Sequence, residues 1–558
     1  MDSTTTRAKP QWLIAVCLFA GSVIVYWTGN NWVSLWDRDE PRFAQPAKEM
    51  LFSSSVRDWI VPHFNNGKEG FFHKPPWCYW QIALAYRLFG VNEFAARFFS
   101  GLWMATSGVL VFHFGRQWSQ RAGLLSAVAL LTTVLAIAMA KMAIADSTLL
   151  LCTLLTVFAL WHIYTGTARL SHRLIFWVSM GLAGLVKGPA ILVVVGPLIV
   201  GLLIVETRRR WFWRLGWLWG VPVMLAIALP WYVAAAYLDS GLVDRFVMYD
   251  ILKRIWQPLE SHRGWPGFYI VVGLLDLWPW SAFLAPVMIT AWRRRSEPIM
   301  KFLLCWLVCP TFALECVSTK MLHYWLGVLP AYCLLFGLAA EAWFDRSDTI
   351  WQRWSSSVRN VVVATFLVLA VGLFAMSQVM FGCIQLGLAF QGTTLAILAV
   401  ISLMVWRRSL GWAVGTVAGS TAVAVLVAYC VTLPGLEQYK FGKHLADKMR
   451  DYREPGRQFA LVSWREPSTI FYLNEGTKPV LTGWAKDVPG WMRDSKLILA
   501  MPIDDYEKLI ASEPSRSAYL TEMGRLSGVD YTRNMRRLSF VILRNEIQGT
   551  VHVEAETP

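Results

Sequence analysis

Long apolar segments, separated by short charged loops, fill the first three quarters of the chain and predict membrane-spanning helices. A helix needs about 20 mostly apolar residues to cross a bilayer. Thirteen segments approach or reach that length: 12–28, 94–115, 122–141, 145–165, 173–187, 189–206, 215–237, 267–291, 301–317, 322–341, 358–380, 387–406 and 410–430. The segments at 173–187 and 189–206 also fit one long re-entrant hairpin. We therefore expect a polytopic α-helical membrane protein with about 13 transmembrane helices.

Basic residues concentrate in every second loop, and this predicts how the helices are oriented. The basic loops contain Arg116 and Arg121, Arg169 and Arg173, Arg208–Arg210 and Arg214, Arg293–Arg295 and Lys301, Arg346, Arg353 and Arg359, and Arg407 with Arg408. Loops rich in Lys and Arg stay in the cytoplasm. With the N-terminus inside, the two long loops at 29–93 and 238–266 and everything after residue 430 are expected on the outside.

After residue 430 the composition becomes that of a soluble domain. Residues 458–463, 478–482, 495–501 and 537–544 have the pattern of short strands, and 467–473 and 503–511 that of helical turns. We therefore divide the chain into a transmembrane domain at 1–430, which we expect to be catalytic, and a small external α/β domain at 431–558.

Composition argues against nucleic-acid binding and against a cysteine-based metal site. The chain is 56% hydrophobic, and its net charge of +15 comes from short basic blocks between apolar segments. Such blocks orient membrane helices, so we exclude a nucleic-acid partner. The nine cysteines form no CxxC pair and have no metal-ligand spacing with the nine histidines. They are interpreted as small core residues, so no metal site is predicted from them.

A dense charged segment follows the first apolar run. Residues 36–44 contain the carboxylates of Asp37, Asp39 and Glu40 and the guanidiniums of Arg38 and Arg42. Such a cluster serves either as a set of structural ion pairs or as a general base with its positioning groups, and a water-accessible membrane boundary suits the second use. The cluster alone leaves this choice open.

Further charged residues are expected at the same external level. They are Lys74 before Pro75 and Pro76, Asp146, Lys187, Asp250 to Arg254, and Ser318 to Lys320 with His323 and Tyr324. Anionic and cationic groups at one depth of an apolar protein favour an amphiphilic substrate, such as a lipid phosphate. The plainer interpretations stay open: Asp146 as a helix cap, Lys187 as a snorkelling helix end, and Tyr324 as an interfacial aromatic.

Several motifs carry a resemblance to a known family. They are Asp39-Glu40-Pro41-Arg42-Phe43-Ala44, residues 58–65, Lys74-Pro75-Pro76 and residues 88–97, followed in order by 184–189, 278–280, 318–330 and 467–473. With these motifs the chain resembles bacterial aminoarabinose transferase-like enzymes. Those enzymes are membrane glycosyltransferases of GT-C type and are related to protein O-mannosyltransferases. The resemblance therefore implies a GT-C fold.

The resemblance also implies roles for individual residues. Asp39 corresponds to the catalytic carboxylate, with Glu40 and Arg42 beside it, so we predict catalytic roles for Asp39 and Glu40 and a substrate-binding role for Arg42. Lys74 and Arg254 correspond to cations that bind the donor phosphate, and Lys320 and Tyr324 to positions near the donor head group; Asp146 and His323 complete the predicted substrate-binding set. His73 and the pair Asp250-Ile251 depart from the usual family pattern, which affects the choice of sugar or acceptor.

The implied reaction uses a sugar joined through phosphate to a polyprenol. We expect transfer of 4-amino-4-deoxy-L-arabinose from undecaprenyl phosphate to lipid A, with inversion, on the periplasmic side of the bacterial inner membrane. The alternative acceptors are a protein hydroxyl or another envelope glycan. A lipid transporter is less favoured, because we find neither an internal repeat nor midplane charge. No cofactor is required, although Asp39 and Glu40 are also able to hold a divalent metal.

Overall fold

The computed structural model describes residues 11–67, 74–241, 248, 253, 264–344, 349–406, 409–476, 478–512, 514, 519–530 and 536–545. The chain forms two compact units. The first consists of Met1–Trp32, His73–Cys78 and Arg97–Leu433, and the second of Val33–Phe72, Tyr79–Ala96 and Pro434–Pro558. Most of the predicted first external loop is therefore grouped with the C-terminal domain.

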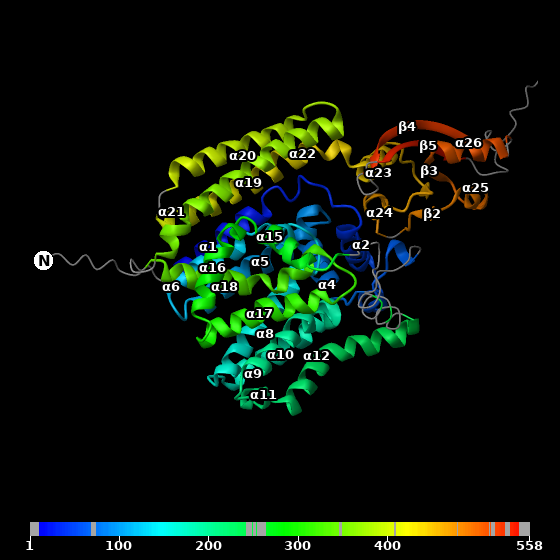
Figure 1. Ribbon diagram of the computed structural model, residues 1–558. Helices are drawn as coiled ribbons and strands as arrows, with labels where there is room; N and C mark the ends of the chain where they lie inside the picture. Colours follow the sequence, from blue (N-terminus) through cyan, green and yellow to red (C-terminus); the bar gives the residue numbers. More distant parts are fainter. Residues whose placement is uncertain are drawn as a thin grey trace, which may run out of the picture. The chain divides into compact units, whose positions relative to one another are not determined.

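The first unit is helical, and each of the thirteen predicted apolar segments contains a helix or a pair of helices (Figure 1). These helices are α1 (Gln11–Trp27), α5 (Glu93–Gly115), α6 (Gln120–Leu131), α7 (Val134–Ala140), α8 (Asp146–Thr165), α9 (Leu170–Lys187), α10 (Leu192–Val205), α12 (Trp217–Leu238), α15 (Phe268–Asp276), α16 (Leu284–Arg293), α17 (Pro298–Glu315), α18 (Leu329–Ala342), α19 (Ile350–Phe381), α20 (Leu386–Val405) and α21 (Leu410–Val427). The short elements are α11 (Arg210–Trp213), α22 (Leu433–Gly435), η2 (Gly188–Ile191), η4 (Trp280–Phe283), η5 (Leu322–Gly327) and η6 (Ala428–Thr432).

Length and composition support several membrane crossings. Within the described residues, eight helices are long and apolar enough to span a membrane, or up to ten if each of two sharply bent pairs is one span. The bent pairs are α6 with α7 and the two helices on either side of Trp278–Pro279. The helices α1 and α18 are shorter and also apolar. The protein is thus a multi-pass membrane protein, and thirteen crossings stay a prediction.

The 36 residues of Leu170–Val205 are helical almost throughout, yet their contacts show that the chain turns back halfway. Near the end of α8, His162 packs against His172 with ring centroids 4.3 Å apart, and the Tyr164 hydroxyl donates to Glu206 at 2.9 Å. At the opposite end of α8, Asp146 contacts Lys187. Both ends of Leu170–Val205 therefore lie at one end of α8, and the turn lies at the other.

Glycine is required at this turn. Gly188 has a φ of 61°, a backbone conformation in which a β-carbon is strained. Pro189 follows and fixes the first residues of η2. The predicted hairpin at 173–187 and 189–206 is therefore present, with its tip at Lys187–Ile191.

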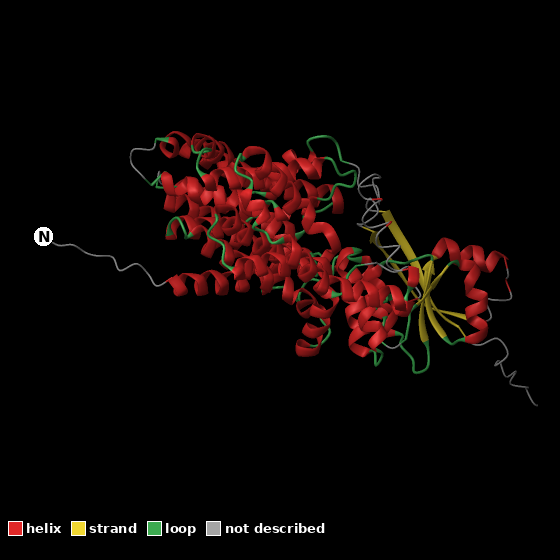
Figure 2. Cartoon of the chain, turned by 90° about the horizontal axis from the view of Figure 1, so that it is seen from below, coloured by secondary structure: helices red, strands yellow, loops and turns green. Residues whose placement is uncertain are grey.

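The second unit contains a five-stranded mixed sheet, and all strands of the described residues belong to it (Figure 2). The strands β1 (Gln458–Val462), β2 (Leu481–Gly483), β3 (Leu497–Pro502), β4 (Leu520–Asp530) and β5 (Arg536–Asn545) have the order β2-β1-β3-β5-β4. β1 is parallel to β2 and β3, whereas β5 is antiparallel to β3 and β4. The helices are α23 (Phe441–Asp451), α24 (Pro467–Leu473), α25 (Val488–Asp494) and α26 (Ile503–Ser512), with the short turns η7 (Glu437–Tyr439) and η8 (Ala485–Asp487).

The first loop adds helices to this unit. They are α2 (Asp39–Phe52), α3 (Val56–Ile60), η1 (Asn65–Gly67) and α4 (Trp77–Phe89). α2 packs against α24, all seven residues of which are buried. The predicted strands at 458–463, 495–501 and 537–544 and the helices at 467–473 and 503–511 are confirmed within two residues, and the small C-terminal α/β domain with them. The strand predicted at 478–482 is shorter and begins later, at Leu481–Gly483.

The predicted orientation is testable by cysteine labelling. Arg57, Glu475 and Arg209 are all exposed, so a cysteine at each is reachable from its own side of the membrane. In a background without exposed native cysteines, a membrane-impermeant maleimide should label Arg57→Cys and Glu475→Cys in intact spheroplasts. Arg209→Cys should react only after permeabilisation, because it lies in a basic loop. Labelling of Arg209→Cys alone would refute this topology.

A buried carboxyl group near the end of α2 predicts a pH effect on the stability of the second unit. Glu49 is 7% exposed and accepts hydrogen bonds from the Gln45 side chain at 2.5 Å and the Asn66 backbone N–H at 3.0 Å. Burial outweighs these bonds and raises the pKa of Glu49 from its usual 4.5 to about 7. The protonated form is therefore favoured by folding, and that stabilisation is lost as the pH rises through 7.

As the pH rises from 4.5 to above 7, the ionisation of Glu49 should lower the free energy of unfolding by about 3 kcal/mol. Replacing it by Gln removes the titration, so Glu49→Gln should lose less stability than the unmodified protein over this range. The measurement is the thermal unfolding midpoint of the solubilised protein at pH 5 and pH 8. Equal pH dependence of the two proteins would show that Glu49 is charged in the folded state.

Candidate active site

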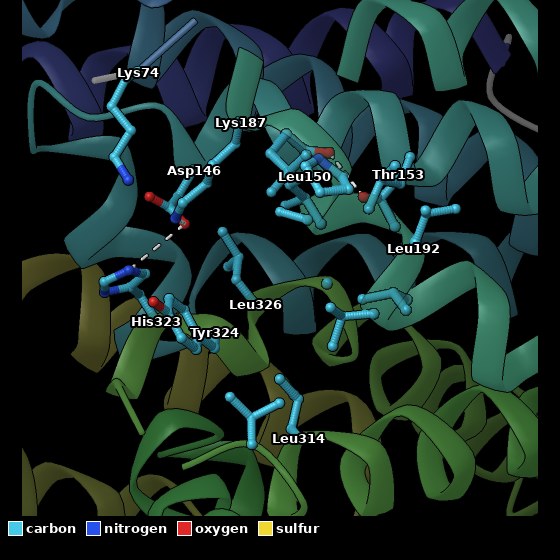
Figure 3. Close-up of a pocket in the computed structure, with 18 residues that line it drawn as sticks. Lys74, Asp146, Leu150, Thr153, Lys187, Leu192, Leu314, His323, Tyr324 and Leu326 are labelled. Atoms are coloured by element: carbon cyan, nitrogen blue, oxygen red, sulfur yellow. Dashed lines mark hydrogen bonds and ion pairs between the residues drawn. The ribbon is translucent and has the colours of Figure 1, made fainter. Parts of the chain in front are cut away.

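A cavity of about 400 Å³ opens among the helices of the first unit. Its polar lining residues come from four separate places in the chain (Figure 3). Lys74 precedes Pro75, Asp146 begins α8, Lys187 ends α9, and His323 with Tyr324 lies in η5. The apolar lining consists of Leu149, Leu150, Pro189, Ala190, Ile191, Leu192, Val193, Val194, Leu314, Val317 and Leu326.

Local structure explains how these side chains meet. α8 begins at Asp146, so its carboxylate lies at the end of the helix that faces the tip of the α9–α10 hairpin. Lys187 is the last residue before that tip. The 3₁₀ turn η5 packs against α8 and α17 and presents His323 to the same point. The polar end of the cavity therefore forms where three chain reversals come together.

Direct contacts connect the polar groups. The Lys187 ammonium lies 2.8 Å from Asp146 Oδ1, and His323 Nε2 lies 3.9 Å from the same oxygen. Lys187 Nζ is also 5.4 Å from the centre of the Tyr324 ring. Together with Lys74, two ammonium groups face one carboxylate, so these lining residues carry net positive charge and favour an anionic ligand.

The rest of the cavity is apolar. In Figure 3, Lys74, Asp146 and His323 lie together at one end, whereas Leu150, Leu192 and Leu314 lie away from them. α10 supplies one wall, and its helix packs against α17. A ligand that fits both ends has an anionic head group and a hydrocarbon tail.

Lys320 occupies a different place. It is 7% exposed, forms an ion pair with Glu315, and donates to the Glu315 carbonyl oxygen at 3.1 Å. Its ammonium also lies 5.7 Å from the centre of the Tyr269 ring. Lys320 is not among the residues that line the cavity, so its predicted donor contact stays a prediction.

The predicted catalytic segment lies in the second unit, at the start of α2. Asp39 is the first residue of the helix and is exposed, whereas Glu40 is fully buried and its Oε2 accepts the Trp36 backbone N–H at 2.8 Å. Arg42 is partly buried. Of the two predicted catalytic carboxylates, Asp39 is the accessible one, whereas Glu40 binds the backbone of the segment before α2.

Arg38 precedes the helix in an unusual conformation. Its φ is 71° and its ψ is −54°, and its guanidinium lies 3.8 Å from Glu466. A non-glycine residue in this region carries backbone strain, which concentrates at functional sites. This strained residue immediately precedes Asp39.

Two predicted features lie outside the described residues, namely Arg254 with the Asp250-Ile251 pair, and His73. Sequence reasoning gave no site role to Glu315 and left Lys187 open. A signal for Glu315 was present, because it is the only acidic residue of the apolar helix α17, and such a residue needs a partner. Within the described residues, no group of three or more His, Cys, Asp or Glu side chains has the geometry of a metal site.

Known proteins share features of this chain. Residues 73–233 match the family model described as dolichyl-phosphate-mannose-protein mannosyltransferase. The undecaprenyl phosphate-α-4-amino-4-deoxy-L-arabinose arabinosyl transferase 1 of Pseudomonas fluorescens is 27% identical over 67% of this chain and 66% of its own. The corresponding transferase 1 of Sodalis glossinidius is 32% identical over 61% of each chain. The matched stretch thus spans less than two thirds of the length of either relative.

The fold has a solved counterpart. The crystal structure of ArnT from Cupriavidus metallidurans bound to undecaprenyl phosphate superimposes with a TM-score of 0.76 over 96% of this chain and 98% of that one, at 19% identity. Its apo state gives a TM-score of 0.75. The chain therefore has the GT-C type of fold. In sequence the chain is thus similar to aminoarabinose transferases and, over residues 73–233, to the protein mannosyltransferase family, and in fold it is similar to ArnT.

Proposed function

We propose that this protein transfers 4-amino-4-deoxy-L-arabinose from undecaprenyl phosphate to lipid A. The reaction takes place on the periplasmic side of the bacterial inner membrane. The single observation that carries the proposal is the cavity whose polar end holds Lys74, Lys187 and His323 and whose walls are apolar. The names of the similar transferases supply the sugar and the lipid carrier.

The cavity suits the donor in charge and in polarity. A polyprenyl phosphate has an anionic phosphate next to an isoprenoid chain, and a volume of about 400 Å³ holds the phosphate with the beginning of that chain. The two ammonium groups are placed to bind the phosphate oxygens, and the leucine and valine side chains of α8, α10 and α17 contact the hydrocarbon.

The positive charge at this end also assists the reaction. Transfer breaks the bond between the anomeric carbon and the donor phosphate oxygen, so undecaprenyl phosphate leaves with one more negative charge. Lys74 and Lys187 stabilise that charge as it develops. They do so without a metal ion, and we therefore propose a metal-independent reaction.

Asp39 acts on the acceptor. An acceptor hydroxyl attacks the anomeric carbon and gives its proton to the Asp39 carboxylate. An ionised phosphate of lipid A needs no base, and Asp39 then orients the acceptor or stabilises positive charge on the sugar ring. In both cases the new bond joins the anomeric carbon to an acceptor oxygen.

The test of this function is the mass spectrum of lipid A from cells with and without the gene. Cells with the gene should contain lipid A heavier by one aminoarabinose, and cells with an Asp39→Asn gene should resemble the deletion. Identical lipid A in all three strains would reject lipid A as the acceptor.

A protein acceptor is the second candidate, because residues 73–233 match the protein mannosyltransferase family. With this acceptor, envelope proteins rather than lipid A should lose a sugar when the gene is deleted. Glycoproteomics of the same strains separates the two acceptors.

Metal independence has a direct test. Transfer by the purified enzyme should continue in the presence of EDTA at unchanged rate, since lysines neutralise the leaving phosphate. A rate that falls with EDTA and returns with Mg²⁺ or Mn²⁺ would place a cation in the mechanism.

A further inference from the structure

Helix α24 of the C-terminal domain is held by a lysine from the first loop. Lys48, on α2, is 8% exposed, and its ammonium donates to the carbonyl oxygen of Phe471 at 3.0 Å and to that of Asn474. These carbonyls lie at the end of α24, where backbone acceptors have no partner within the helix. The ammonium also lies 4.9 Å from the centre of the Phe471 ring.

Removing the Lys48 ammonium from water costs free energy, so its hydrogen bonds to α24 have to offset that cost. Burial lowers the pKa of Lys48 to about 8, which still leaves the ammonium mainly charged at neutral pH. A charged donor on carbonyls at a helix C-terminus is favourable both as a hydrogen bond and through the helix dipole. An apolar side chain of similar length would fill the space without fixing the direction of the contact.

Tyr472 makes a second connection from the same helix. Its hydroxyl accepts the backbone N–H of Leu35 at 2.9 Å and donates to Glu93 Oε1 at 2.9 Å. Leu35 precedes α2, and Glu93 begins α5. A single phenol oxygen thus binds both ends of the first loop to α24.

α2 depends on such contacts with α24 for its stability. It has 14 residues and contains Pro46, which removes one backbone hydrogen bond, and so short a helix is marginal on its own. Lys48 lies nine residues after Asp39, which is about 14 Å along a helix. Its hold on α24 therefore limits the motion of the whole helix, including the end that presents Asp39.

We propose that Lys48 and Tyr472 are positioning residues, through which α24 of the C-terminal domain sets the place of α2 and hence of Asp39 during sugar transfer. The C-terminal domain then acts in the reaction through the position of α2. This inference rests on the proposed function, and specifically on the role of Asp39 in it.

The experiment measures kcat and KM of the full-length enzyme in lipid nanodiscs, with undecaprenyl phosphate-aminoarabinose and lipid A. Tyr472→Phe removes one oxygen, and Lys48→Met removes the ammonium while keeping an unbranched side chain of nearly the same length. Each should lower kcat at least tenfold and change KM for the donor by less than twofold, because the lysines of the donor cavity are untouched. The matched control is Lys448→Met on the neighbouring helix α23. Lys448 is 40% exposed and pairs with Asp451, so its replacement should leave both constants unchanged.

A double substitution distinguishes positioning from general support of the fold. If Lys48 acts through Asp39, then Asp39→Asn combined with Lys48→Met should have the same residual rate as Asp39→Asn alone. The positioning role would be overturned if the double variant lost kcat by the product of the two single effects. It would also be overturned if Tyr472→Phe and Lys48→Met kept their kcat while Asp39→Asn was inactive. Wild-type turnover in Asp39→Asn would instead overturn the role of Asp39 on which this inference rests, whereas the absence of transfer to lipid A by the unmodified enzyme would overturn the proposed function.

Discussion

Replacing Asp39 by asparagine should lower the rate of sugar transfer by about 10²-fold or more, while undecaprenyl phosphate still binds. Asparagine keeps the size of the side chain and most of its hydrogen bonds, but it neither accepts a proton nor stabilises positive charge. Asp39 is exposed at the start of α2, so the substitution should not disturb packing. The measurement is single-turnover transfer, alongside binding of the lipid carrier.

Asp37 supplies the control for this prediction. It lies in the same charged segment, and Asp37→Asn should reduce the rate much less than Asp39→Asn. Glu40 is not a clean comparison, because it is fully buried and binds the Trp36 backbone; its loss should lower stability as well as rate. Similar effects of Asp37→Asn and Asp39→Asn would make the segment structural.

Removing the cations of the cavity should have the second largest effect. Lys74→Ala should weaken binding of undecaprenyl phosphate by about 1 to 3 kcal/mol, the usual range for a hydrogen bond to a charged group. That range corresponds to a loss of roughly fivefold to 150-fold in affinity. Isothermal titration with the purified enzyme measures it, and undecaprenol, which has no phosphate, is the control ligand.

Lys187 requires a paired design, because its ammonium lies 2.8 Å from the buried carboxylate of Asp146. Lys187→Met alone leaves that charge without its partner, at a cost of roughly 3 to 5 kcal/mol in stability. Lys187→Met with Asp146→Asn avoids this cost and should still lose phosphate affinity. Combined with Lys74→Ala, the losses should not add, since both ammonium groups meet one phosphate. Equal loss of affinity for undecaprenol and its phosphate would mean that these lysines only maintain the fold.

Arg254 was predicted to share the phosphate with Lys74, and it lies outside the described residues. Its role stays a prediction. Arg254→Ala belongs in the same titration, where a coupled loss with Lys74→Ala would place it at the same phosphate.

Some elements were missed in the sequence for a clear physical reason. β4 was not predicted, because Leu520–Asp530 contains Gly524, Gly528 and several charged residues and shows no alternating apolar pattern. Among the described strands it lies at the edge of the sheet and pairs with β5 alone, with a register shift between Glu522 and Gly524. Its pairing partner, rather than its own propensity, makes it a strand.

The first loop shows the same dependence on context. Its motifs were recognised in the sequence, and Lys74 lines the cavity of the first unit, while its predicted contact with the donor phosphate stays a prediction. Its grouping with residues 434–558 was not predicted, because the contacts of Asn65 with Val480 and of Lys48 with Phe471 join residues separated by more than 400 positions. No local pattern encodes such contacts.

The sequence by itself determined the membrane class, the apolar segments, most strands of the small domain and the resemblance to aminoarabinose transferase-like enzymes. These follow from hydrophobic periodicity and from short motifs, both of which are local properties of the chain. Only the tertiary structure decided that Asp146, Lys187 and His323 meet, that Lys320 pairs with Glu315, and that Glu40 is buried while Asp39 is exposed. The physical reason is that partner choice and burial depend on chain reversals, such as the one at Gly188, which bring distant residues into one low-dielectric site.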